Sequence, residues 1–319
     1  MIGLARFVMR GRLQALVLAV GGASSLLFCW ISAAVVALVT LRKGAAEGAW
    51  LLFWALLPAS IMLYMVDDSG PLTVLVGTFT LALVLRATVS LPMAILASVL
   101  VGVVTGLLLV AFGSAYLEQL ATAFGEFLAR METQLSAGGE QIVLPRPETG
   151  QIAGLLGGGG ATLAVLCLLL ARYWQAALFN PGGFGQEFRA LHYPVSVTLL
   201  LVAMAVILSS TGATYRSWAM MCLLPLSFAG LSLVHARIEM RGGGPGWLVS
   251  FYLIWLVFDP VKLLVVCAAI ADSWFNFRQR WAPQGGPLSP PGDGAAEDSE
   301  ESRRRNTPGE QDSDDPKDR

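Results

Sequence analysis

The residue types that most enzymes use for catalysis are scarce in this sequence and lie far apart. The 319 residues include two histidines, and the four cysteines each stand alone in an apolar stretch. The chain contains no HExxH zinc signature, no GxSxG nucleophile motif and no CxxC pair. We therefore predict that the protein is not an enzyme and that it holds no metal or other cofactor.

A strong turn signal stands among aromatic residues at 174–188, where the sequence reads WQAALFNPGGFGQEF. Asn, Pro and Gly are the residue types that tight turns favour. Two interpretations stay open: the loop presents backbone amides and aromatic faces to a ligand or partner, or it is an interfacial turn with an aromatic belt. The candidate binding residues of this loop are Trp174, Asn180, Pro181, Gly182, Gly183 and Phe184.

Four charged residues close to the end of the apolar region are further candidates for a ligand or partner site. Asp272 stands in an apolar stretch, where an acidic group is costly enough to need a partner, and Arg278 is near enough in sequence to neutralise it. Asp259 and Lys262 are three residues apart, so a helix would place them on one face. For both pairs the alternative is an ion pair with a purely structural role.

Small residues at helical spacing indicate close packing between helices. Gly154 and Gly157 belong to a glycine-rich stretch that resembles a phosphate-binding loop only superficially, because the GK[ST] ending is missing. Ala15 and Ala19 are four residues apart and share one helix face. We assign all four residues to helix–helix packing through small side chains.

The composition places the chain in a membrane. Only 13% of its residues are charged and 55% are hydrophobic, whereas soluble domains carry about 25% charged residues. Uncharged runs such as 93–113 match the roughly 20 residues that cross a hydrocarbon core. We predict an all-α fold, with a polytopic transmembrane helix bundle of about eight to ten membrane segments over residues 1–281.

Residues 282–319 have a different composition, rich in Pro, Gly, Ser, Asp and Glu and almost without large apolar side chains. Such a segment cannot bury enough surface to offset the entropy of ordering it. We expect a disordered, acidic, cytoplasmic tail. Acidic residues flank its run of three arginines at 303–305, so we predict no nucleic-acid partner. The lipid bilayer is the partner that the composition demands.

Charge placement favours one topology. Two apolar blocks, 13–41 and 247–276, contain internal turn signals, the second at Asp259-Pro260. If both blocks are single helices, the Lys and Arg residues outside the tail divide eight to seven between the two sides, with Lys262 inside the second block. If both are hairpins, they divide twelve to four. Since cytoplasmic loops carry an excess of Lys and Arg, we predict hairpins, with both termini on the cytoplasmic side of a bacterial inner membrane. A single helix over either block stays open as the alternative.

Residues 115–150 form the largest predicted outer loop. Within it, 116–135 carries apolar residues at helical spacing and an acidic polar face, which predicts an amphipathic helix. This helix could lie on the outer membrane face or cap the bundle. Helices that bind membrane surfaces usually carry Lys and Arg on the polar face, so we expect the cap.

Three stretches of residues 5–281 together resemble the YybS-type predicted membrane proteins of bacteria. They are Leu41-Arg42-Lys43-Gly44 with Glu47-Gly48, Asn180-Pro181-Gly182-Gly183-Phe184 with Glu187-Phe188, and Asp272-x-Trp274-Phe275-x-Phe277-Arg278. The first helices of that family are similar to those of the substrate-binding membrane subunits of energy-coupling-factor vitamin transporters, in which an Ala-x-x-x-Ala face docks the coupling subunit. Ala15 and Ala19 match that pattern. The resemblance implies a small-molecule-binding transporter subunit that works with a coupling protein.

The sequence leaves a second function open. Basic inner loops without a catalytic motif also fit a membrane scaffold or assembly protein that recruits cytoplasmic partners through the 173–193 loop and the tail. A polar or aromatic cavity that opens to the outer side between helices would favour the binding subunit. A core packed solid with aliphatic side chains would exclude it.

Overall fold

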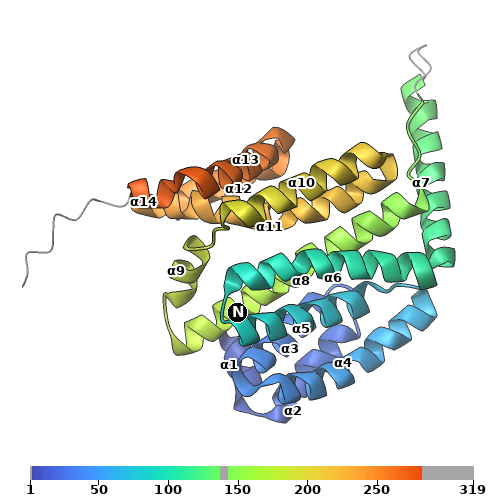
Figure 1. Ribbon diagram of the computed structural model, residues 1–319. Helices are drawn as coiled ribbons and strands as arrows, with labels where there is room; N and C mark the ends of the chain where they lie inside the picture. The colour runs from blue at the N-terminus through green and yellow to red at the C-terminus, as the bar shows by residue number, and fades with distance from the viewer. Residues whose placement is uncertain (1, 137–142, 282–319) are drawn as a thin grey trace, which may run out of the picture. The chain divides into compact units, whose positions relative to one another are not determined.

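The computed structural model describes residues 2–136 and 143–281, and every regular element in these two ranges is helical (Figure 1). The helices are α1 (Ile2–Arg10), α2 (Arg12–Ala23), α3 (Cys29–Lys43), α4 (Ala45–Val66), α5 (Gly70–Thr88), α6 (Leu91–Phe112), α7 (Ser114–Leu135), α8 (Thr149–Phe179), α9 (Gly183–Arg189), α10 (Val195–Thr211), α11 (Ala213–Met240), α12 (Pro245–Val257), α13 (Asp259–Phe275) and α14 (Phe277–Trp281). The predicted all-α fold is confirmed. The expectation of a disordered tail concerns residues 282–319, which lie outside the described residues.

Five helices are long and apolar enough to cross a membrane by themselves: α4, α5, α6, α8 and α11. Each has at least 19 residues, which at about 1.5 Å per residue approaches the ~30 Å thickness of a hydrocarbon core. Large apolar side chains point outward from them; Phe53, Leu100 and Met220 are 59%, 67% and 67% exposed. Lipid, and not water, solvates such a surface, so the chain is an integral membrane protein.

Both predicted internal breaks are present. Helices α2 and α3 are joined by residues 24–28 and pack against each other, with Ser32 Oγ donating to the Ala19 carbonyl at 2.6 Å. Helices α12 and α13 are bent by 114° at Phe258, whose extended backbone ends α12. Pro260 then stands in the first turn of α13, where its missing N–H costs nothing. By length and composition, five of the described helices are candidate spans, or six if α12 and α13 form one bent span, and α2 and α10 are shorter apolar helices.

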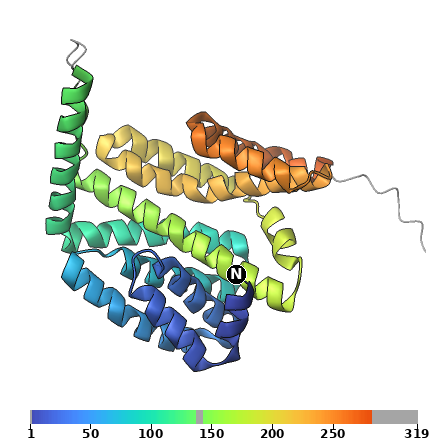
Figure 2. The same ribbon diagram turned by 180° about the vertical axis from the view of Figure 1, so that it is seen from behind.

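Helix α8 is the central element of the bundle. It packs against α3, α5, α6 and α11, and its first turns also meet α7 (Figures 1 and 2). A Cβ on Gly157 would lie 2.5 Å from the Gly102 carbonyl oxygen of α6, and one on Gly154 would lie 2.2 Å from Ser217 Oγ of α11. Glycine therefore allows both close approaches between helices.

The charged residues divide between two ends of the helical bundle. The basic end is where α3, α5, α8, α11 and α13 finish; within the described residues it carries twelve Lys and Arg residues against four acidic ones. The acidic end, which includes α7, carries four basic and seven acidic residues of the described chain. The basic residues of the basic end are Arg6, Arg10, Arg12, Arg42, Lys43, Arg86, Arg172, Arg189, Arg237, Arg241, Arg278 and Arg280. The acids of the acidic end are Asp67, Asp68, Glu118, Glu126, Glu132, Glu148 and Asp259. This twelve-to-four division is the one predicted for hairpins at both breaks.

Helix α7 runs across the ends of α6 and α8 instead of parallel with them (Figure 1). Its one buried residue, Leu117, forms a small cluster with Leu109 and Ile152 near the starts of α7 and α8. Further along the helix, Phe124 and Phe127 are 47% and 58% exposed. The predicted amphipathic helix is therefore present, and it meets the bundle at the ends of α6 and α8. Its role as a cap stays a prediction.

Candidate functional site

Two adjoining pockets lie at the acidic end beside the first turns of α7, and together we call them the acidic-end hollow. The larger, of about 370 Å³, lies between the facing ends of α4, α5 and α6. The smaller, of about 230 Å³, lies between α5, α6 and α8. The residues that line both pockets are Ser69, Thr73, Thr105, Leu109 and Tyr116.

Two glycines of α8, which have no side chain, keep the smaller pocket open. Gly159 and Gly160 both line it. A Cβ on Gly160 would lie 3.8 Å from Thr73 Oγ1, and one on Gly159 would meet nothing within 4 Å. The glycine run that begins at Gly157 therefore serves two purposes: its first member lets α8 approach α6, and its last two leave space.

The polar groups of the acidic-end hollow are hydroxyls and carboxylates. Asp68 is half-buried, and its Oδ1 accepts a hydrogen bond from the Gly70 backbone N–H at 2.7 Å. Neither Asp67 nor Asp68 forms an ion pair within the described residues. Burial, assisted by the nearby Asp68 carboxylate, raises the pKa of the Tyr116 hydroxyl above its ordinary value. The hollow therefore carries unpaired negative charge beside one aromatic hydroxyl.

The remaining walls of the hollow are apolar. Leu63, Leu72, Leu108 and Phe112 line the larger pocket, and Leu155, Leu156 and Leu163 line the smaller. An apolar pocket with a few convergent polar groups is the usual form of a small-molecule site. Its chemistry suits a small, partly apolar molecule with a positive charge or hydrogen-bond donors.

None of the residues of this hollow was among the predicted site residues. In the sequence, Asp67 and Asp68 stand in a short connection between two apolar runs, and Tyr116 begins the amphipathic stretch 116–135. The available signal was the pair of hydroxyls at Thr73 and Thr105 inside otherwise apolar spans. Polar groups at membrane depth need a partner or a function, but only the packing of the helices brings these two to one pocket.

The predicted turn at the end of α8 does not form a single site. Trp174 is only 1% exposed and points into the core, where its Nε1 has no hydrogen-bond partner among the described residues. Asn180, Pro181 and Gly182 are exposed. Gly182 adopts φ +87°, a conformation that favours glycine. Gly183 begins α9.

Aromatic rings pack around the start of α9. The ring of Phe184 lies edge-on to Tyr173 at 5.9 Å and stacked on Phe188 at 6.0 Å. Phe188 in turn meets His235 on α11 at 5.2 Å. Phe184 therefore helps to attach α9 to α8 and α11, while the exposed part of the turn is limited to residues 180–182.

Asp272 and Arg278 form the predicted pair. Their side chains are 6% and 15% exposed, and Arg278 Nε lies 3.2 Å from Asp272 Oδ2. The other guanidinium nitrogens donate to the carbonyls of Arg189 and Leu191, at 2.5 and 2.7 Å. Burial lowers the pKa of Arg278, and the Asp272 carboxylate opposes that shift. Because the chain's own groups surround the pair, its geometry is that of a structural link between α13–α14 and the α9–α10 connection.

Asp259 and Lys262 also pair, at 2.7 Å, as their spacing predicted. This pair is exposed at the opposite, acidic end, with the Lys262 ammonium 5.7 Å from the centroid of the Trp255 ring. The predicted charged residues are therefore divided between the two ends. Neither member of this pair lines the acidic-end hollow.

Ala15 and Ala19 pack inside the bundle. They are 3% and 0% exposed, and their helix α2 packs against α3 and α4. Because this face is covered by the chain's own helices, it offers no surface to a coupling subunit in this conformation.

A scan of protein-family models finds none that matches this chain, and searches of curated proteins and of solved structures find no significant match. The three stretches that resemble YybS-type proteins all lie at the basic end, at the α3–α4, α8–α9 and α13–α14 turns. The Arg42 guanidinium of the first stretch lies 4.0 Å from the centroid of the Phe179 ring, one residue before the second stretch. Membership of that family stays a prediction.

Proposed function

We propose that this integral membrane protein binds a small molecule and that the acidic-end hollow is its binding site. The observation that carries the proposal is the presence of two unpaired carboxylates, Asp67 and Asp68, beside apolar walls that glycine residues of α8 keep open. The ligand class is a small, partly apolar organic cation. Its charge interacts with Asp68, and its apolar part lies against the leucines and Tyr116.

The resemblance to substrate-binding subunits of energy-coupling-factor transporters supports a role of this binding in uptake. A coupling protein is then the expected partner. Because Ala15 and Ala19 are buried within the bundle, that partner would dock on another surface, and the basic end offers exposed turns such as 180–182.

The orientation that we propose places the basic end in the cytoplasm of a bacterium and the acidic-end hollow outside its inner membrane. The excess of Lys and Arg at the basic end supports it. Single cysteines at positions 44, 68, 185 and 213 of a cysteine-free variant test it with a maleimide that does not cross membranes. In intact cells we expect labelling at 68 and 213 but not at 44 and 185; the reverse pattern would reject the orientation.

Binding is tested on the purified full chain in detergent by calorimetric titration with benzyltrimethylammonium, a small aromatic cation. Phenylmethanesulfonate, an anion of similar size, is the matched probe. We expect the cation to bind and the anion not to bind. Asp68→Asn should weaken cation binding about tenfold, because a charge-assisted contact is lost.

Two glycine variants distinguish the effect of filling the hollow from a general effect on helix stability. Gly160→Leu places a side chain in the smaller pocket and should abolish cation binding. Gly125→Leu, on α7 with nothing within 4 Å of the new Cβ, should leave it unchanged. Equal binding of both probes, or of wild type and Gly160→Leu, would refute the assignment of this hollow.

A scaffold function is the second candidate, because Asn180, Pro181 and Gly182 form an exposed turn directly after α8. A photo-crosslinking residue at position 181 tests it in living cells. A single recurrent protein adduct would support recruitment through this turn. Adducts with lipid alone would count against it.

A further inference from the structure

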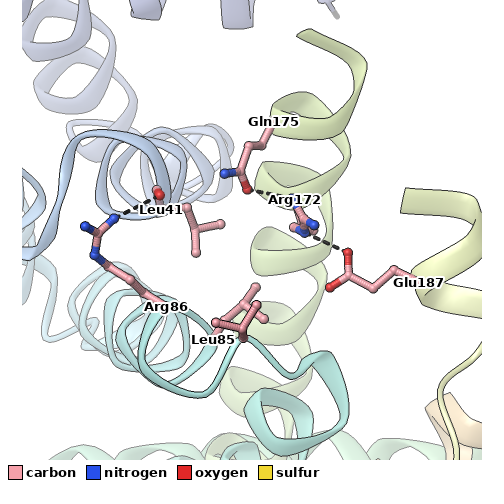
Figure 3. A pocket seen from close by; sticks show the side chains of 7 residues that line it. Leu41, Leu85, Arg86, Arg172, Gln175 and Glu187 are labelled. Carbon is pink, nitrogen blue, oxygen red and sulfur yellow. Dashed lines mark hydrogen bonds and ion pairs between the residues drawn. The ribbon is translucent and has the colours of Figure 1, made fainter. Parts of the chain in front are cut away.

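A separate pocket, of about 340 Å³, lies at the opposite end of the bundle from the acidic-end hollow, and we call it the basic-end pocket. It is bounded by the final turns of α3, α5 and α8 and by α9 (Figure 3). Its polar side chains are Arg86, Arg172, Gln175 and Glu187, and Leu41 and Leu85 lie between the two arginines (Figure 3). The acidic-end hollow contributes none of these residues.

Arg86 brings an unneutralised positive charge to this pocket. Its Nη1 donates to the carbonyls of Thr40 and Leu41, at 3.3 and 3.1 Å. These carbonyls belong to the last turn of α3, where the helix dipole favours a cation. No carboxylate pairs with Arg86 within the described residues, and its Nε and Nη2 make no hydrogen bond there. Two N–H-bearing nitrogens therefore stay available to a ligand.

Arg172 faces the pocket from the other side and is held by two neighbours. Its Nε donates to Glu187 Oε2 at 2.7 Å, and its Nη1 donates to Gln175 Oε1 at 2.9 Å (Figure 3). The side chains of Arg172 and Glu187 are 26% and 24% exposed. Glu187 offsets the charge of Arg172 and fixes its plane, while Nη2 makes no hydrogen bond among the described residues. The pocket as a whole keeps one net positive charge.

We propose that the basic-end pocket binds a phosphate group, with Arg86 and Arg172 as its ligands and with Gln175 and Glu187 as positioning residues. The planar guanidinium group presents paired N–H donors that match phosphate oxygens. The charges of Arg42 and Lys43, in the last turn of α3, add to the attraction. This site is independent of the proposed cation site at the other end of the bundle.

The phosphate could belong to a lipid headgroup or to a soluble phosphate compound. The pocket lies where membrane helices end, at the depth of headgroups, and the exposed Val89 side chain, 85% accessible, forms an apolar part of its rim. Both sources share the same recognition by Arg86 and Arg172, so one experiment with two arms separates them.

The first arm measures, by native mass spectrometry of the full chain released from nanodiscs, the retention of phosphatidylglycerol relative to phosphatidylcholine. The second arm is a calorimetric titration with inorganic phosphate. Arg86→Gln should lower binding about tenfold in the arm that reports the true source, because a charge-assisted interaction is lost. Arg241→Gln removes an exposed charge from the same end of the chain and should change binding less than twofold.

A second pair of variants avoids any loss of the contacts between Arg86 and α3. Val89 has φ +51°, a conformation that Asn and Asp adopt more readily than valine. Val89→Asp places a negative charge at the rim and should also lower binding about tenfold, whereas Val89→Asn should bind like the wild type.

If binding in the lipid arm depends on Arg86 and on the charge at position 89, the ligand is a lipid headgroup. If only binding in the phosphate arm shows this dependence, the ligand is a soluble compound. The proposal is overturned if Arg86→Gln and Val89→Asp both bind like the wild type. It is equally overturned if Arg241→Gln reduces binding as much as Arg86→Gln, since the attraction would then belong to the general charge of this end.

Discussion

Replacing Arg278 with methionine tests how the last helices are held to the rest of the bundle. The Arg278 guanidinium is the only cation within the described residues that forms an ion pair with the buried Asp272 carboxylate. It also donates to the Leu191 carbonyl at 2.7 Å and to Ser232 Oγ at 3.2 Å. One side chain therefore joins α14 to α13, to α11 and to the α9–α10 connection.

The expected loss of unfolding free energy depends on which buried group each variant leaves without its partner. Arg278→Met leaves the Asp272 carboxylate with the Phe277 backbone N–H at 2.9 Å as its remaining partner. Breaking a buried ion pair on one side costs about 3–5 kcal/mol of unfolding free energy. Asp272→Asn preserves shape and leaves Arg278 its carbonyl acceptors, so we expect a smaller loss of about 1–3 kcal/mol.

The measurement is unfolding by dodecyl sulfate in mixed micelles, followed by tryptophan fluorescence. The double variant should lose less than the sum of the single losses, by about 1–3 kcal/mol, because neither charge is then left alone. Arg280→Met, an exposed neighbour, is the control and should stay within about 0.5 kcal/mol of the wild type. Strictly additive losses, or an Arg278→Met variant as stable as the wild type, would refute the assignment of a linked buried pair.

Three further changes test other parts of the fold by the same unfolding assay or by fluorescence. Val89→Asn should raise stability by about 1 kcal/mol, since valine is strained in the left-handed region that this position occupies; an unchanged midpoint would mean that the residue is not held there. Gly157→Ala should lower stability by about 1–3 kcal/mol because its Cβ would press on the backbone of α6, whereas Gly125→Ala, in open space, should not destabilise the protein. A tryptophan at Phe127 should be quenched by brominated lipids if the exposed face of α7 lies on the membrane; fluorescence insensitive to those lipids would show that this face meets water or protein.

Local features of the chain could be predicted from the sequence because they depend on neighbouring residues. Apolar runs of about 20 residues require lipid and helices. The breaks near residues 24–28 and at Phe258 follow from turn residues and from the division of Lys and Arg between two sides. The pairs Asp272–Arg278 and Asp259–Lys262 are six and three residues apart, so the local course of the chain brings the members of each pair together. The apolar periodicity of residues 116–135 predicted helix α7.

What only the tertiary structure decided is which helix faces meet. A membrane helix is apolar on every side, so periodicity does not distinguish the face that packs against protein from the face that meets lipid. That is why the sequence analysis did not predict the residues of the acidic-end hollow and of the basic-end pocket. Thr73, Thr105 and Tyr116 come from three helices, and Arg86 and Arg172 stand 86 positions apart in the chain. The sequence by itself determined that the chain folds as helices in a bilayer with its charges at two ends; helix packing alone decided where those ends are hollow.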